Sequence, residues 1–134
     1  MGKFNDLLTD IFSVFDSAAW VAESIATHPS NYISSSSTEY VRITIIPAGG
    51  GINPQSAAGH LIADIFTPAG EGPTRTFAIA DILDTYLANQ VLTTSGSGTT
   101  QFQDGALGSD KVDEDNPSLS RATYSISFNY FGAN

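Results

Sequence analysis

The chain has 134 residues, of which 41% are hydrophobic and 10% aromatic, so its length and composition suit one domain with a buried core. The formal net charge of −9 argues against a surface that grips nucleic acid, because phosphate binding requires clustered Lys and Arg side chains. The absence of cysteine excludes disulfide bonds and cysteine-based metal sites. No secretory signal and no apolar run of membrane-spanning length is visible, so we expect a soluble protein made in the cytoplasm.

Charged residues make up only 14% of the chain. Much of the polar surface must therefore consist of Ser, Thr, Asn and Gln, whose desolvation costs less than that of ions. Such a surface suits a protein that packs against neighbours, but it also fits an ordinary β-rich protein with many Ser and Thr residues. Composition alone leaves both interpretations open.

The first predicted element is an amphipathic helix that begins near Phe4 and fades between Trp20 and Ala26. Its apolar side chains recur at spacings of three and four residues. They are Phe4, Leu7, Leu8, Ile11, Phe15, Ala18 and Ala19. These residues form one apolar stripe along the helix. The polar residues that lie mostly outside this stripe are Asn5, Asp6, Asp10 and Asp16. Pro29 ends any helical geometry, since the residue before a proline avoids it.

A polar run at residues 34–38 is predicted to be a loop, or an arm that orders against a neighbour. Residues 39–46 form the first predicted strand, with the β-branched side chains of Val41, Ile43 and Ile45 on one face. Pro47 is expected to end this strand, because proline cannot donate a hydrogen bond to the ladder.

A long glycine-rich loop is predicted for residues 48–59. The second strand is expected at residues 60–67, with Leu61, Ala63 and Ile65 on one side. A turn rich in proline and glycine follows at residues 68–73.

A second amphipathic helix is predicted for residues 74–89, with Thr74 as a possible cap. Residues 93–118 are expected to be loops that enclose a short strand at residues 100–103. Residues 122–130 form the clearest predicted strand, because apolar and polar side chains alternate strictly. Its apolar members are Ala122, Tyr124, Ile126, Phe128 and Tyr130.

This order of elements predicts an α+β protein with a single domain over residues 1–134. We expect one four-stranded mixed or antiparallel sheet with helices packed on one face. The long buried apolar runs of a doubly wound parallel sheet are missing.

No group of residues points to catalysis or to a bound cofactor. His28 and His60 stand in no zinc-binding spacing, and the glycine clusters match no phosphate-binding motif. The acidic residues around Lys111 do not follow a calcium-binding spacing, so we interpret them as a solvated loop. They are Asp104, Asp110, Asp113, Glu114 and Asp115. We therefore expect no enzyme activity, no metal and no cofactor.

Five charged residues are the candidates for contacts with other subunits or partners. They are Arg42, Arg75, Arg121, Glu39 and Asp84. Arginines among neutral polar residues often anchor subunit contacts through paired hydrogen bonds to a carboxylate. Ordinary surface ion pairs are the equally weighted alternative, and the sequence assigns no pairing.

Three stretches together resemble one known family. They are the strand segment EYVRITIIP from Glu39, the segment GHLIADIFTPAGEG from Gly59, and the helical segment FAIADIL from Phe77. With a leading helix and a last strand of alternating aromatics, this order is similar to the tail terminator family of long-tailed bacteriophages, which includes the lambda-type minor tail protein U. The resemblance covers most of the chain, although its motifs are short.

The resemblance implies a structural protein of the virion and no catalysis. Family members form a hexameric ring on the last ring of the tail tube, stop tube growth, and provide the surface that joins the neck below the head. DNA passes through the ring without specific binding. The implied partners are copies of the chain, the tail tube protein and a neck or connector protein, at the junction of tail and neck, after assembly in the host cytoplasm. No membrane is involved.

Two other interpretations stay open. The chain could be a different neck or head-completion protein, because such proteins share small size and ring assembly. It could also be an α+β module that binds a small ligand or peptide, since long glycine-rich loops can line a pocket.

Overall fold

The structure, a computed structural model, describes residues 3–29, 39–50, 56–68, 74–93, 98–108, 111–112 and 119–132. Two helices of 14 residues and one short helix accompany the strands in this part of the chain. The helices are α1 (Lys3–Asp16), α2 (Ala18–Ala22) and α3 (Thr74–Leu87). The strands are β1 (Thr27–Pro29), β2 (Tyr40–Gly50), β3 (Ala57–Pro68), β4 (Val91–Leu92), β5 (Gly98–Leu107), β6 (Lys111–Val112) and β7 (Leu119–Gly132).

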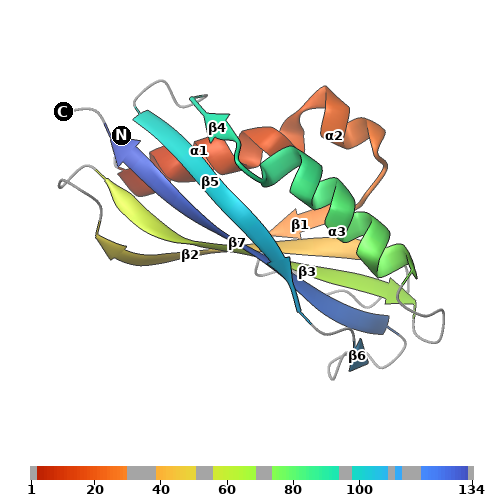
Figure 1. The fold of residues 1–134 in the computed structure, drawn as a ribbon. Coiled ribbons are helices and arrows are strands. Elements are labelled where there is room, and N and C mark those ends of the chain that lie inside the picture. Colours follow the sequence, from red (N-terminus) through yellow and green to blue (C-terminus); the bar gives the residue numbers. More distant parts are fainter. Residues whose placement is uncertain are drawn as a thin grey trace.

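All of these strands belong to one twisted sheet (Figure 1). Six strands follow the order β1-β2-β3-β7-β5-β4, and β6 pairs with β7 outside that path. Only the β1–β2 pairing is parallel; the other pairings are antiparallel. The last strand of the chain thus lies in the middle of the sheet, between β3 and β5.

The prediction of a four-stranded sheet is wrong, because three short strands extend it. β1, β4 and β6 have three, two and two residues. Segments this short carry no period-two pattern of their own, so pairing with the long strands β2, β5 and β7 creates them. The long strands correspond to the four predicted segments, with wider bounds.

The helices cover one face of the sheet, as Figure 1 shows. Helix α1 packs on β5 and β7, and α3 packs on β3, β5 and β7. The inward side chains of the long strands are buried against them, because alternate residues of a strand point to the same face. This core includes Val41, Ile43, Leu61, Ala63, Ile65, Tyr124, Ile126, Phe128 and Tyr130. None of the helices described here is long and apolar enough to cross a membrane.

The predicted end of the first strand at Pro47 is also wrong. β2 continues to Gly50, and Pro47 lies opposite Gly59 of β3. β1 pairs only with Val41–Ile43, so Pro47 lies where β1 no longer flanks β2, a position where proline is tolerated. A Cβ at Gly59 would collide with the Ile46 carbonyl, so glycine lets the two strands approach at this point.

Much of the predicted loop structure is strand. Residues 48–50 and 57–59 belong to the β2–β3 hairpin, and β5 with β6 occupies part of residues 93–118. The predicted strand at residues 100–103 is only the central part of β5, because a register shift between Phe102 and Gly105 breaks the alternation of its sequence. The predicted arm at residues 34–38 lies outside the described residues, as do the acidic residues 110 and 113–115.

Helix α1 is rotated about its axis relative to the orientation that its apolar stripe predicts. Asp6 and Asp10 are buried, whereas Phe4 and Leu8 are 56% and 42% exposed. The hydroxyls of Thr100 and Tyr130 donate hydrogen bonds to Asp10 and Asp6, at 2.8 and 3.3 Å. These polar groups of the sheet satisfy the buried carboxylates, so one acidic flank of the helix faces inward.

Candidate functional site

An ion-paired centre lies on the face of the sheet opposite the helices. Asp64 of β3 is 4% exposed and accepts hydrogen bonds from three side chains of the neighbouring strands. Arg121 donates through Nε and Nη2 at 3.1 and 3.0 Å, Thr123 through Oγ1 at 3.2 Å, and Arg42 through Nη2 at 3.4 Å. The strand register causes this arrangement, because Arg42 and Thr123 lie directly opposite Asp64 and Arg121 lies on the diagonal.

Aromatic rings continue this centre along the same face. The rings of Tyr40 and Phe66 stack with centroids 4.4 Å apart, and Phe66 is only 1% exposed. The guanidinium carbons of Arg42 and Arg121 lie 5.1 and 5.9 Å from the centroid of the Phe66 ring, within cation–π range. One carboxylate therefore faces two guanidiniums, and the group carries a net positive charge in a strongly acidic chain.

The pair Arg75–Glu39 joins the start of α3 to the residue before β2. Arg75 donates to the two carboxylate oxygens of Glu39 at 2.6 and 2.9 Å. The hydrogen bond to Glu39 raises the pKa of Arg75, so this side chain stays charged. Both side chains are partly exposed, and the pair therefore adds little to stability.

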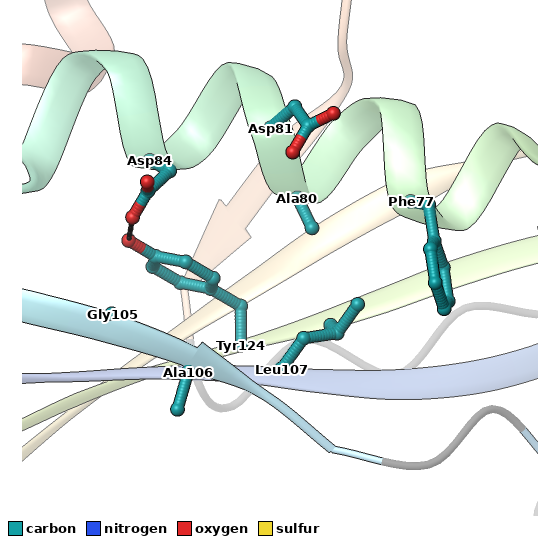
Figure 2. A pocket seen from close by; sticks show the side chains of 8 residues that line it. All are labelled: Phe77, Ala80, Asp81, Asp84, Gly105, Ala106, Leu107 and Tyr124. Atoms are coloured by element: carbon teal, nitrogen blue, oxygen red, sulfur yellow. Dashed lines mark hydrogen bonds between the residues drawn. The ribbon is translucent and has the colours of Figure 1, made fainter.

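A groove of about 180 Å³ lies between α3 and the sheet, as Figure 2 shows. The sheet contributes Tyr124 of β7 and residues 105–107 of β5 to its lining. The helix contributes Phe77, Ala80, Asp81 and Asp84. Two of the helix residues are carboxylates, and Phe77 is 53% exposed. The groove therefore combines an apolar lining with negative charge.

Tyr124 joins the two sides of this groove. Its hydroxyl donates a 2.7 Å hydrogen bond to Asp84 (Figure 2). Burial, the bond to Asp84 and the charges of Asp84 and Asp104 raise the pKa of Tyr124 well above its ordinary value of 10. A Cβ at Gly105 would overlap the Tyr124 ring and hydroxyl, so glycine at the bulge of β5 leaves room for Tyr124 to reach the helix.

A second shallow groove follows the outer side of α1. It is lined by Leu8, Thr9, Phe12, Ser13 and Asp16. Phe4, Leu8 and Phe12 are spaced four residues apart and therefore share one helix face. We call these three residues the α1 outer stripe. Phe4 and Leu8 are exposed, whereas Phe12 is partly buried and packs against the core.

The structure brings the five predicted contact residues into three separate intramolecular groups. Arg42 and Arg121 meet at Asp64, Arg75 meets Glu39, and Asp84 meets Tyr124. Their role in contacts with other proteins stays a prediction. Sequence reasoning missed Asp64 and Tyr124 as polar centres. The one available signal for Asp64 is a lone carboxylate within the apolar strand segment LIADIF.

No family model matches the sequence, and no curated protein matches it significantly. Solved structures do match the fold. A chain that carries no functional name has a TM-score of 0.71 and 12% sequence identity, over 97% of this chain and 96% of that one. A chain of the virion of a native gene transfer agent particle has a TM-score of 0.57 and 13% identity, over 98% of this chain and 92% of that one. At such identities the likeness establishes a shared fold.

Proposed function

We propose that this protein is a structural component of a virion, and more narrowly a tail terminator. In this role, copies of the chain form a ring on the end of the tail tube, stop its polymerisation and provide the surface for joining the neck. The observation that carries the proposal is the fold shared with a chain of a gene transfer agent virion, which spans nearly the whole length of both chains. The sequence motifs that resemble the terminator family narrow it to that role.

The distribution of polar and apolar groups supports a role in assembly. All three arginines are held in ion pairs with carboxylates of their own chain. Two of the three apolar side chains of the α1 outer stripe, Phe4 and Leu8, are exposed. We assign it to the contact between neighbouring copies, since a ring needs one repeated head-to-tail contact that closes.

The net charge supports passage of DNA without binding. The chain carries −9, so a ring of copies is strongly acidic. A wall of that sign repels phosphate and lets DNA slide through a lumen without attachment. The remaining partners in this proposal are the tail tube protein on one face of the ring and a neck or connector protein on the other.

Electron microscopy of particles made without this protein tests the proposal. A terminator that is absent leaves tube growth unchecked, so we expect overlong tails of variable length that carry no head. Supplying the wild-type chain in trans should restore uniform tails. Tails of normal length without this protein would contradict the terminator role.

The same images distinguish the terminator role from the main alternative. A different neck or head-completion protein leaves tail length normal and blocks only the joining of heads. A labelled copy of the chain found away from the junction of tail tube and neck would contradict both assignments.

A further inference from the structure

The groove between α3 and β5 has the size and the charge of a binding site for a single cationic side chain. We propose that it binds the guanidinium of an arginine that a partner protein presents. Carboxylates of α3 would hold the guanidinium, and the apolar lining would hold the aliphatic stem. This inference does not depend on the terminator role.

The size of the groove limits the occupant. Its volume of about 180 Å³ lies below the roughly 300–1,000 Å³ of sites that hold drug-sized molecules or cofactors. One long side chain fits this space better than a whole ligand does. Asp81, Asp84 and Phe77 of the lining are exposed, so a residue on the surface of another protein can reach the groove.

The lining selects a positive charge with an apolar stem. Asp81 and Asp84 are exposed carboxylates one helical turn apart on α3, so they can face one ligand together. Leu107 and Ala80 provide apolar contacts, and the half-exposed ring of Phe77 can stack on a planar cation. A planar guanidinium suits both the carboxylates and the aromatic ring of this lining. It binds carboxylates through two parallel hydrogen bonds and stacks on aromatic faces.

The polar wall of the groove is held in place before any ligand arrives. Tyr124 donates its hydroxyl to Asp84, and this bond joins the sheet side of the groove to its helix side. A carboxylate has lone pairs for further donors, so Asp84 can accept a second hydrogen bond from a ligand. Asp84 and the exposed Asp81 can therefore face a cation that enters from solvent.

The arginine comes from another protein rather than from a second copy. The chain has three arginines, and each already pairs with a carboxylate of its own chain. Arg75 is bound by Glu39, and Arg42 and Arg121 share Asp64. Docking one of them in the groove of a neighbour would first break an internal ion pair. A different partner with an unpaired surface arginine avoids this cost.

The experiment titrates the ¹⁵N-labelled full chain with the peptide acetyl-Gly-Arg-Gly-amide, followed by backbone amide shifts. We expect saturable shifts at residues 105–107 of β5 and residues 77–84 of α3. The peptide with citrulline in place of arginine has the same shape without the charge and should not bind. The double variant D81N/D84N should bind the arginine peptide roughly tenfold more weakly or worse, since it loses charge-assisted hydrogen bonds.

Asn at position 84 can still accept the Tyr124 hydrogen bond, so the double variant should keep a native spectrum. The matched control Asp16→Asn removes one exposed carboxylate at the α1 groove and should bind like the wild type. Shifts that do not saturate, equal binding of the citrulline peptide, or unchanged binding by D81N/D84N would overturn the proposal. Equal binding of the corresponding lysine peptide would overturn the choice of a guanidinium.

Discussion

Gly105 occupies a position at which any side chain would displace Tyr124. A Cβ there would overlap the Tyr124 ring and hydroxyl, whereas a Cβ at Gly108 would meet the Thr123 carbonyl at 3.4 Å, an ordinary contact. Both glycines lie on or just after β5, so they form a matched pair for mutation.

The change Gly105→Ala should lower the free energy of unfolding by about 1–3 kcal/mol, because Tyr124 must move and its bond to Asp84 breaks. Gly108→Ala should lie within about 0.5 kcal/mol of the wild type. Urea unfolding of the two variants measures the difference. Equal stabilities would show that Tyr124 adjusts without loss.

Tyr124 should also make the protein sensitive to alkaline pH. Its pKa is raised in the folded chain, so above its ordinary pKa of 10 the unfolded chain releases this proton while the folded chain keeps it. The folded state then binds more protons, and the free energy of unfolding falls as the pH rises.

The urea midpoint of the wild type should therefore drop between about pH 9 and about pH 11 more than that of Tyr124→Phe. The other tyrosines contribute equally to both proteins, so the difference isolates this hydroxyl. Parallel pH profiles for the two proteins would refute the raised pKa.

Asp64 is the shared counter-ion of Arg42 and Arg121 on the face of the sheet opposite the helices. The change Asp64→Asn leaves two partly buried guanidiniums without their counter-ion, and we expect a loss of about 2 kcal/mol in the free energy of unfolding. The matched change Glu39→Gln, at the more exposed pair with Arg75, should cost less than about 1 kcal/mol. Thermal and urea unfolding test this order, and a larger loss for Glu39→Gln would contradict it.

At the scale of elements, α1 illustrates how a sheet sets the orientation of a helix. Its sequence predicts an apolar stripe that includes Phe4 and Leu8, yet the buried arc is shifted toward Asp6 and Asp10. The reason is tertiary, because hydroxyls of β5 and β7 supply donors where those carboxylates enter the core.

The change Thr100→Val removes the 2.8 Å hydrogen bond to Asp10 while keeping the shape of the side chain. We expect a loss of about 1–3 kcal/mol, since Asp10 is fully buried and loses a donor. The exposed control Thr85→Val should change stability by less than about 0.5 kcal/mol. A wild-type melting temperature for Thr100→Val would indicate that this contact does not dock α1.

At the scale of the whole molecule, one layer of helices covers one face of the sheet. The opposite face carries the ion-paired centre of Asp64. On the helix side, Phe4 and Leu8 of the α1 outer stripe are exposed apolar side chains. The arginines of this molecule are paired within the chain, while apolar side chains of α1 are exposed. Such a surface is suited to a repeated contact between copies of the chain.

The change Leu8→Asp should leave the monomer folded, because Leu8 is 42% exposed, and should prevent assembly by placing a charge in the contact. The control Val21→Asp adds the same charge on α2, where Val21 is 65% exposed, and should assemble normally. Circular dichroism checks the fold, and electron microscopy with the tail tube protein checks the rings. Normal rings from Leu8→Asp would exclude the stripe as the ring contact.

Local pattern was enough to predict the long elements of this protein. Alternation in residues 122–130 predicts β7 and its buried face, and the three- and four-residue spacings predict α1 and α3, because period and apolar content are properties of neighbouring residues. Only some of the residues of the candidate sites could be predicted from local pattern. Arg42, Arg75 and Arg121 stand out as rare cations and Glu39 was among the candidates, but the sequence did not assign the pairs and missed Asp64.

Only the tertiary structure decided the rest. The short strands β1, β4 and β6 exist because a long strand lies beside them, and β5 runs through a glycine-rich segment because β7 pairs with it. The Asp64 centre, the inward acids of α1 and the α3–β5 groove join residues far apart in the chain. Their free energy comes from cross-strand and helix–sheet contacts, which depend on register and packing rather than on local sequence.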